Sequence, residues 1–295
     1  MLKTTNLNLN LTLKAGVIGF PIDHSLSPII HNYHLKKLNI NGSYEKYLVP
    51  VDTFEESINN LIYKENLQGF NVTIPHKERM LKFCDHLSNS AKNIGAVNTI
   101  KILENGKLFG HNSDGEGFVK NLLNHYPDFK FIAKKCLIIG AGGASRAIIY
   151  SLIKLKVSKI YIANRNLENV YKIIDDFKNF SKKNDIEIIA VELNNNFNFI
   201  NQLDLIINTS SMGMNNQNPL NLDLSMAQKN AIICDIVYKP LLTQFLLNAK
   251  KNNLPILTGI GMLVEQAIVG FEMWYHDKPK YSVELENYLI KIANL

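Results

Sequence analysis

The chain has 295 residues, of which 46% are hydrophobic and 20% charged, and its formal net charge is +6. This is an ordinary globular mixture with enough apolar mass for two domains of about 100–200 residues each. The lysines are scattered and form no block, which argues against a stripe that binds nucleic acid. A modest positive field suits small anionic ligands, although a composition rich in Lys and Asn explains the charge equally well.

The three cysteines and eight histidines give no sign of a disulfide framework or a metal site. Cys84, Cys136 and Cys234 are far apart and include no Cys-x-x-Cys pair. The segment from Leu7 to Leu13 alternates leucine with polar residues, unlike a signal peptide, and no segment reaches 18 consecutive apolar residues. We therefore expect a cytoplasmic protein that binds no metal, no nucleic acid and no membrane.

Strand and helix signals alternate through the first part of the chain, from Lys14 onward. Glycine and proline bound the apolar runs, and Asn105-Gly106 is a hairpin signal. The expected elements, in chain order, are a strand at 16–20, a helix from Ser27 to about Leu38, a strand at 44–49, a helix capped by Asp52 that ends at Tyr63, a strand at 69–74, and a hairpin of 98–102 and 107–109.

The second part repeats the alternation with more strongly apolar strands. Strands that alternate with helices imply right-handed crossovers and a parallel sheet, so we expect an α/β fold with two domains. The expected strands are 136–139, 159–163, 187–191, 205–207 and 231–234, and the tail from Gly261 is expected to be helical.

A glycine-rich turn directly follows the expected strand at 136–139 and opens a helix. Glycines in this context let the backbone turn tightly and approach a pyrophosphate, which then rests on helix-terminal N–H groups. The pattern alone is weak, because such a turn can be purely structural and Ser145 replaces the third glycine of the usual fingerprint. The candidate dinucleotide-binding residues are Gly140, Ala141, Gly142, Gly143 and Ala144.

The strand at 159–163 leads into Asn164 and Arg165. An NAD-specific site usually places a carboxylate near this point to hold the ribose 2′-hydroxyl. The guanidinium of Arg165 could instead pair with a 2′-phosphate and stack on adenine, or it could be a solvated surface group. The pattern favours NADP over NAD.

Hydroxyl and ammonium groups gather beside two of the first strands. Ser25 and Ser27 stand at a helix N-terminus, where they could hold a carboxylate, although Ser27 could merely cap the helix. Lys77 follows the strand at 69–74, four residues after Thr73, where ligands of α/β sheets gather. A lysine there can donate a proton to a developing alkoxide, although most lysines simply face solvent.

Four further polar residues are candidates for substrate contacts. Asn98 is the first residue of the expected hairpin, and Asp114 lies in Asn112-Ser-Asp-Gly115, which an Asx-type turn also explains. Tyr238 stands at the carboxyl end of the strand at 231–234. Gln266 lies on a helix opened by Gly259-Ile-Gly-Met262, either as a hydroxyl-binding amide or as a half-buried residue without a role.

Taken in order, these motifs make the chain resemble the shikimate dehydrogenase family over nearly its whole length from Gly16 onward. Any one of them is weak, but a long series in family order is specific. The series is Ser-Leu-Ser-Pro, Asn-Val-Thr-Ile-Pro-His-Lys, Gly-Ala-Val-Asn-Thr, Asn-Ser-Asp-Gly, Gly-Ala-Gly-Gly-Ala, Asn-Arg, Asp-Ile-Val-Tyr-Lys-Pro and Gly-Ile-Gly-Met-Leu-Val-Glu-Gln-Ala.

The resemblance implies a substrate-binding, catalytic domain at 1–114 and 259–295, with a Rossmann-like, doubly wound NADP-binding domain at 115–258 between its two parts. It also implies roles for single residues. Lys77 and Asp114 match the family's catalytic pair. Ser25 and Ser27 would bind the substrate carboxylate with Tyr238 nearby, while Thr73, Asn98 and Gln266 would hold the ring hydroxyls and the reacting oxygen. The residues that would contact NADP(H) are Asn164, Arg165, the loop from Asn208 to Met214, and Gly259.

The chain also departs from the family pattern in the region of the cofactor. Asn166 and Asn169 stand where the family commonly has Thr and a basic residue, so the 2′-phosphate clamp is thinner than usual. Ser113 stands where the family commonly has Thr, which is a mild change.

The activity implied is the reversible NADPH-dependent reduction of 3-dehydroshikimate to shikimate in aromatic amino acid biosynthesis, by a monomer or homodimer. One alternative is a dual quinate/shikimate dehydrogenase that uses NAD or NADP. An alternative of another class is a catalytically silent NADP sensor, which would have no need of both Lys77 and Asp114.

Overall fold

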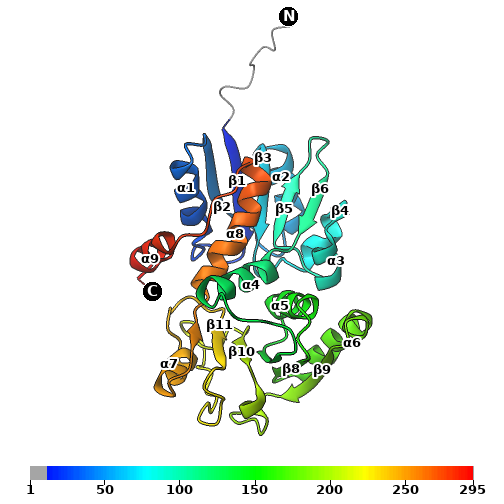
Figure 1. The fold of residues 1–295 in the computed structure, drawn as a ribbon. Helices are drawn as coiled ribbons and strands as arrows, with labels where there is room; N and C mark the ends of the chain where they lie inside the picture. The colour runs from blue at the N-terminus through cyan, green and yellow to red at the C-terminus, as the bar shows by residue number, and fades with distance from the viewer. Residues whose placement is uncertain (1–11, 295) are drawn as a thin grey trace, which may run out of the picture. The chain divides into compact units, whose positions relative to one another are not determined.

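Two six-stranded sheets organise residues 12–294, which this computed structural model describes (Figure 1). Residues 7–11 of the alternating N-terminal segment lie outside the described residues. The chain divides into two compact units, each assembled from separate stretches of sequence. Unit 1 comprises Met1–Ser88, Val97–His111 and Ala267–Lys280, and unit 2 comprises Asn89–Ala96, Asn112–Gln266 and Tyr281–Leu295.

Unit 1 is built on the strands β1 (Leu13–Gly19), β2 (Gly42–Leu48), β3 (Leu67–Val72), β4 (His86–Leu87), β5 (Thr99–Ile102) and β6 (Leu108–His111), with the helices α1 (Ser27–Lys37) and α2 (Phe54–Tyr63). Its sheet is mixed and has the order β2-β1-β3-β5-β6-β4. β1 runs parallel to β2 and β3, whereas β5 runs antiparallel to β3 and β6. The carboxyl ends of β1 and β3 therefore meet the start of β5 at one edge.

Two local expectations in unit 1 have different outcomes. The hairpin around Asn105-Gly106 is confirmed, because β5 and β6 pair antiparallel and Gly106 has a φ of +77°, which glycine adopts without steric cost. The expected cap at Asp52 is wrong. Thr53 is the N-cap residue of α2, the helix starts one residue later, at Phe54, and no side chain accepts a capping hydrogen bond there.

Trp274 closes the core of unit 1 from far along the sequence. It lies on α8 (Ile260–Tyr275), is fully buried, and donates its indole N–H to the Ile100 carbonyl at 2.8 Å. Gly69 of β3 makes room for the ring, since a Cβ there would lie only 2.2 Å from the indole nitrogen. Tyr275 also donates its hydroxyl to the Ser43 carbonyl at 2.8 Å. The C-terminal part of α8 thus completes a core whose strands come from the first third of the chain.

Unit 2 is built on the strands β7 (Lys135–Ile139), β8 (Lys159–Asn164), β9 (Glu187–Glu192), β10 (Leu205–Asn208), β11 (Ile232–Asp235) and β12 (Ile256–Leu257). The sheet is parallel throughout and has the order β12-β11-β10-β7-β8-β9. The helices of unit 2 outside α8 are α3 (Asn89–Ile94), α4 (Asp114–His125), α5 (Gly143–Lys154), α6 (Leu167–Lys183), α7 (Gln244–Lys251) and α9 (Val283–Ile292).

The apolar run of β7 explains why helices cover both faces of this sheet. Cys136 and Ile138 belong to one core cluster, which contains the buried face of α5, while Leu137 and Ile139 belong to the other, which contains α7. Alternate residues of a strand point to opposite faces, so a strand that is apolar at every position is buried from both sides. This is the doubly wound α/β architecture that the alternation of signals predicts, and it is confirmed.

The helical tail expected from Gly261 is two helices. α8 ends at Tyr275, and His276 follows with a φ of +57° in the left-handed region. α9 begins at Val283, where the Ser282 hydroxyl oxygen accepts a hydrogen bond from the Leu285 N–H at 3.2 Å. A serine before an apolar run is a strong capping signal, so the second start was readable in the sequence.

Candidate functional site

The order of the strands in unit 2 reverses between β7 and β10. Counted from β7, the sheet has the order 6-5-4-1-2-3, and ligands of such sheets bind where the order reverses, outside the carboxyl ends of the strands. Gly140 follows β7 directly, with a φ of +113°. A Cβ at Gly140 would lie 2.9 Å from the hydroxyl oxygen of Thr209, which follows β10. Glycine is therefore required at this point of the turn.

The rest of the glycine-rich turn is open. A Cβ on Gly142 would meet no heavy atom of the protein within 4 Å, and one on Gly143 would meet only the Cβ of Ala96 at 4.0 Å. α5 begins at Gly143, so the N–H groups of its first turn have no partner within the helix. An open backbone at a helix N-terminus fits the pyrophosphate of a dinucleotide. Ser145, in place of a third glycine, is fully buried.

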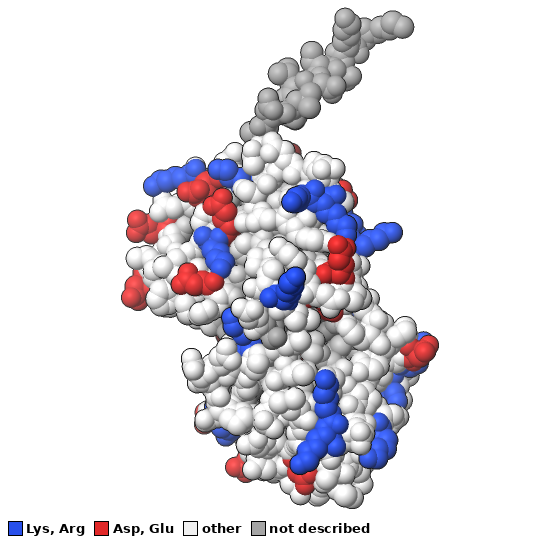
Figure 2. Space-filling view, turned by 90° about the vertical axis from the view of Figure 1, so that its left-hand side faces the viewer, with Lys and Arg blue, Asp and Glu red and all other residues white. Residues whose placement is uncertain are grey.

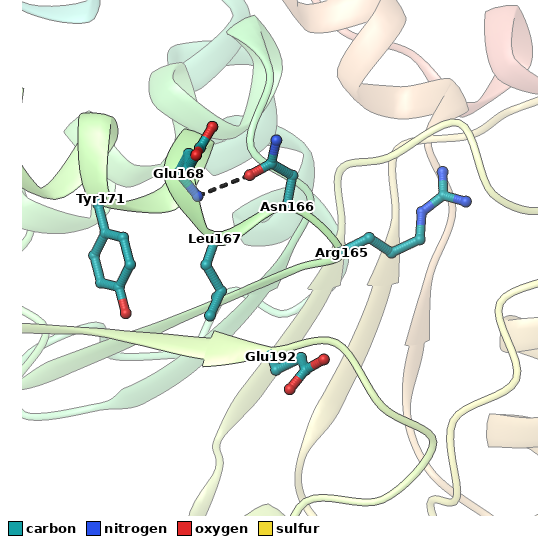
Figure 3. A pocket seen from close by; sticks show the side chains of 6 residues that line it. All are labelled: Arg165, Asn166, Leu167, Glu168, Tyr171 and Glu192. Atoms are coloured by element: carbon teal, nitrogen blue, oxygen red, sulfur yellow. Dashed lines mark hydrogen bonds between the residues drawn. The ribbon is translucent and has the colours of Figure 1, made fainter.

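Arg165 borders a surface hollow beyond the end of β8. The hollow is lined by Arg165, Asn166, Leu167, Glu168, Tyr171 and Glu192 (Figure 3). Arg165 extends away from Tyr171 and makes no hydrogen bond or ion pair with another residue in the described part of the chain. Its guanidinium therefore keeps its donors for a ligand. Two carboxylates border the same hollow, and Glu192 lies opposite Asn164 in the β8–β9 register.

Asn166 has a structural task that accounts for one departure from the family pattern. Its side-chain oxygen accepts a hydrogen bond from the Glu168 N–H at 2.8 Å and caps α6. Its backbone carbonyl accepts a hydrogen bond from the amide of Asn164, also at 2.8 Å. Asn166 therefore orders the turn that presents Arg165. Asn164 is itself engaged within this turn.

Asp235 anchors the loop that follows β10, a role that no motif in the sequence indicated. Its carboxylate accepts hydrogen bonds from the Asn208 amide at 3.0 Å, the Thr243 hydroxyl at 2.6 Å and the Val237 N–H at 3.0 Å. Burial raises the pKa of the Asp235 carboxyl to about 6, although these three donors lower it. The available signal was a carboxylate at the carboxyl end of a buried strand.

The loop from Asn208 to Met214 is held in place by short polar contacts. The Ser210 hydroxyl donates to the Asn208 side-chain oxygen at 2.7 Å, and the Asn208 amide donates to the Met212 carbonyl at 3.0 Å. Gly213 has a φ of +90°, and a Cβ at this position would lie 3.2 Å from the Thr243 side chain. Met214 is 46% exposed, so its side chain is accessible to a ligand.

In unit 1, Ser25 and Ser27 lie between the end of β1 and the start of α1. Ser27 is the first residue of α1 and is buried, whereas Ser25 is half-buried. The Ser25 hydroxyl oxygen accepts the Ser27 N–H at 3.3 Å, and the N-cap position falls on Leu26, which makes no side-chain cap. The alternative that Ser27 only caps the helix is therefore wrong, and its hydroxyl instead faces that of Tyr44.

Thr73 and Lys77 lie at the same sheet edge, past the carboxyl end of β3. The Thr73 N–H donates to the Ile18 carbonyl at 3.0 Å, which fixes it against β1. The Val97 N–H donates to the Lys77 carbonyl at 2.8 Å, and Lys77 is half-buried. His76, between them, is buried and hydrogen-bonds the Val49 carbonyl at 2.7 Å, so its role is structural.

Asn98 joins this edge because it immediately precedes β5. Its carbonyl accepts the Val72 N–H at 2.8 Å, and its own N–H donates to the His111 carbonyl at 3.0 Å. Only 2% of Asn98 is exposed. Unit 1 therefore brings Ser25, Ser27, Thr73, Lys77 and Asn98 to one edge of its sheet, as expected for residues that contact one ligand.

Asp114 belongs to unit 2, where it is the first residue of α4. Its N–H donates to the Asn112 side-chain oxygen at 3.1 Å, so the Asx-type turn is present and sets the start of the helix. Gly115 permits close packing of α4 on α5, since a Cβ there would lie 2.4 Å from the Ala147 carbonyl oxygen. Lys77 and Asp114 belong to different units, and their pairing stays a prediction.

Three more candidates lie in unit 2. Gln266 is 8% exposed, and its side-chain amide donates to the Leu263 carbonyl at 2.9 Å. Its backbone carbonyl accepts the Ser113 hydroxyl at 3.2 Å. Burial raises the pKa of the Tyr238 phenol, which keeps it protonated as a donor. Gly259 has a packing reason of its own, because a Cβ there would lie 2.3 Å from the Ile236 carbonyl oxygen.

Surface charge, metal-ligating side chains and helix length bear on other kinds of site. On the face in Figure 2, Lys and Arg are interspersed with Asp and Glu and form no continuous basic stripe. Among residues 12–294, no three His, Cys, Asp or Glu side chains gather as metal ligands would. Within the same residues, no helix has the length and apolarity needed to span a membrane.

Comparison with known proteins decides the family. The model of the shikimate dehydrogenase substrate binding domain matches residues 17–100, and that of shikimate / quinate 5-dehydrogenase matches residues 124–237. The shikimate dehydrogenase (NADP(+)) of Bacillus subtilis is 40% identical over 265 residues, covering 90% of this chain and 92% of that protein. The chain belongs to the shikimate dehydrogenase family. The Methanococcus maripaludis enzyme of the same name is 39% identical over 95% of this chain and 98% of its own.

Solved structures agree with this assignment. A shikimate dehydrogenase in complex with NADP+ has a TM-score of 0.85 and 33% identity, covering 96% of both chains. The Thermus thermophilus enzyme in complex with NADP(H) and shikimate has a TM-score of 0.81 and 29% identity, covering 96% of this chain and 99% of that one. A ligand-free 5-ketofructose reductase of Gluconobacter has a TM-score of 0.85 and 28% identity, covering 96% and 99%. The shared fold thus serves more than one carbonyl substrate.

Proposed function

We propose that the chain is an NADPH-dependent shikimate dehydrogenase, which reversibly reduces 3-dehydroshikimate to shikimate in aromatic amino acid biosynthesis. The observation that carries the proposal is the edge of the unit 1 sheet, where Ser25, Ser27, Thr73, Lys77 and Asn98 gather in a member of this family. Two hydroxyls at a helix start suit the substrate carboxylate, and an amide, a hydroxyl and an ammonium suit oxygens on its ring.

Unit 2 is the proposed NADP(H)-binding part, and unit 1 the proposed substrate-binding part. The open glycine turn, the free donors of Arg165 and the anchored loop from Asn208 to Met214 support the first assignment. The domain bounds expected from the sequence, 1–114 with 259–295 and 115–258, remain part of this proposal, as do a cytoplasmic location and a monomeric or homodimeric state.

NADPH supplies a hydride when it is bound, and the residues of this chain handle the charge that develops on the ketone oxygen. The Lys77 ammonium is the proposed group that stabilises this charge and delivers the proton from Nζ. Asp114 is proposed to orient Lys77 and to accept a hydrogen bond from a ring hydroxyl. Tyr238 and Gln266 would donate to the carboxylate and to a hydroxyl respectively.

The test is an assay of the purified chain with shikimate and with quinate, each with NADP+ and with NAD+. We expect the highest kcat/KM for shikimate with NADP+. Higher efficiency with quinate would favour the dual quinate/shikimate alternative, for which a Corynebacterium glutamicum quinate dehydrogenase in complex with NAD is a structural relative at 25% identity. Cofactor binding without turnover of either substrate would favour the silent sensor, against which the presence of both Lys77 and Asp114 argues.

Substrate anchoring has a separate test. Replacing Ser25 and Ser27 together by Ala is expected to raise KM for shikimate with little change in kcat, because the carboxylate contact is made equally in the ground and transition states. An unchanged KM would remove the two serines from the proposed site.

A further inference from the structure

The side chain of Asn112 joins two separate stretches of unit 2. Asn112 lies between β6 and α4 and is 2% exposed. Its Nδ2 donates to the Ala96 carbonyl at 3.0 Å, and its Oδ1 accepts the Asp114 N–H at 3.1 Å. One amide therefore connects the segment that follows α3 to the first residue of α4.

The two partners of Asn112 admit only one orientation of its amide. A backbone carbonyl can only accept a hydrogen bond, so the atom that faces Ala96 is the nitrogen. A backbone N–H can only donate, so the atom that faces Asp114 is the oxygen. Turning the amide over would set oxygen against oxygen and N–H against N–H in a buried region, and both hydrogen bonds would be lost. The amide is therefore a spacer of fixed length between Ala96 and Asp114.

The backbone around Ala96 is held by contacts of its own. The Arg146 Nε donates to the Ile94 carbonyl at 2.5 Å, and Nη2 of the same guanidinium pairs with Asp176 at 2.8 Å. Gly95 has a φ of +74°, and a Cβ at this position would lie 3.2 Å from Nη2 of Arg146. Ala96 itself is fully buried. The Ala96 carbonyl therefore has little freedom to follow a shift of α4.

Ala96 and Asn112 are also the points at which the chain leaves and re-enters unit 2. Residues 97–111 between them belong to unit 1, include Asn98 and donate a hydrogen bond to the Lys77 carbonyl at 2.8 Å. The hydrogen bond from Asn112 to Ala96 thus joins the two ends of this excursion inside unit 2.

We infer that Asn112 is a positioning residue, which holds Asp114 at a set distance from the backbone of Ala96. The inference rests on the proposed function, in which Asp114 orients Lys77 and accepts a hydrogen bond from a ring hydroxyl. Catalysis depends steeply on the placement of such a group, so a small displacement at the start of α4 lowers turnover. The contribution of Asn112 to turnover is therefore exerted through Asp114.

A double-mutant cycle tests whether Asn112 acts through Asp114. Asn112→Ala removes both hydrogen bonds of the amide, and we expect it to lower kcat with shikimate and NADP+ by about tenfold. In an Asp114→Asn background there is no carboxylate left to position, so the same substitution should lower kcat by less than about twofold. A merely structural role would lower kcat by the same factor in both backgrounds.

Asn121→Ala is the matched control for this cycle. Asn121 also belongs to α4, is likewise 2% exposed, and donates its amide to the Thr258 carbonyl at 2.9 Å. It stands about two helical turns from Asp114. Any effect of Asn121→Ala on kcat should therefore be the same factor with and without Asp114→Asn.

Asn112→Ser separates the spacer from the local turn. A serine hydroxyl can still accept the Asp114 N–H, but its shorter side chain no longer spans the distance to the Ala96 carbonyl. We expect Asn112→Ser to lose about as much kcat as Asn112→Ala, since it keeps the turn and loses the link. If Asn112→Ala does not fold, the cycle is completed with Asn112→Ser, for which the same factors are expected.

The outcomes that overturn the inference differ from those that overturn the proposed function. An active wild type in which Asn112→Ala costs the same factor in both backgrounds, or in which Asn112→Ser keeps the wild-type kcat, overturns the inference alone. A wild type that turns over no shikimate overturns the proposed function, and this inference with it.

Discussion

Replacing His31 should make the free energy of unfolding of this protein less dependent on pH in the acid range. His31 is fully buried on α1, between the ring of Tyr44 and that of Phe271, whose centroid is 6.0 Å away. Burial, with a smaller contribution from His34, lowers the pKa of His31 from 6.5 to about 3. The unfolded chain therefore takes up a proton near pH 6.5 that the folded chain refuses until about pH 3. Stability contributed by neutral His31 is present above pH 6.5 and is lost as pH falls through this window.

The size of the effect follows from the two pKa values. At pH 5 the unfolded imidazole is almost entirely protonated and the folded one is neutral, so the free energy of unfolding falls by about 2 kcal/mol relative to pH 8. His34, whose pKa burial lowers to about 4, adds a similar loss. His31→Phe keeps a stacked ring and removes one of the two contributions. Any constant cost of fitting the larger ring cancels when the same variant is compared at two pH values.

Urea unfolding at pH 8, 7, 6 and 5 measures this directly. The wild type should lose about 2 kcal/mol more than His31→Phe between pH 8 and pH 5. If His31→Phe loses as much stability with acid as the wild type does, His31 does not stay neutral in the folded protein and the reasoning fails.

Three other predictions concern cofactor and chemistry. Arg165→Ala should raise KM for NADP+ by about 10- to 100-fold more than for NAD+, because a charge-assisted contact to a 2′-phosphate is lost; equal changes would place Arg165 outside the cofactor site. Glu192→Gln should lower KM for NADP+ by about twofold to fivefold and leave NAD+ unaffected, since a carboxylate beside the same hollow repels the phosphate; an unchanged ratio would contradict this. Lys77→Ala should lower kcat by about 10²–10⁴-fold with NADPH binding intact. When Asp114→Asn is added, kcat should fall by less than the product of the two single effects. A change in KM alone would make Lys77 a binding group.

The sequence predicts local structure well where one residue type decides it. The strand-turn-helix around Gly140 and the hairpin at Asn105-Gly106 are confirmed, because both depend on backbone angles or contacts that glycine allows. The strand preceding Asp235 is confirmed as well, but the hydrogen bonds that the carboxylate makes are with Asn208 and Thr243. Such contacts between distant segments leave no periodic signal, so the anchoring role of Asp235 was not predicted.

The site residues divide in the same way. Lys77 could be placed past the end of a strand because that strand can be read from the sequence, whereas the substrate roles of Ser27 and Asn98 came only from the order of the motifs. The hydrogen bonds that run from Tyr44 through Asn71 to the Asn98 carbonyl could not be predicted. They depend on the strand order β2-β1-β3-β5 and on the register between those strands. The positions of strands can be predicted from the sequence more readily than which strands pair with each other.

The burial of Trp274 against Gly69 has a consequence for how the protein is made. The strands of unit 1 are complete once residue 111 has been synthesised, but the ring that fills their core comes from α8, more than 150 residues later. The sheet of unit 2, in contrast, is built from one uninterrupted stretch, Lys135–Leu257. We therefore expect the sheet of unit 2 to be able to form on the ribosome while the earlier strands of unit 1 still await their core, so the N-terminal strands depend on protection from aggregation until synthesis is nearly finished.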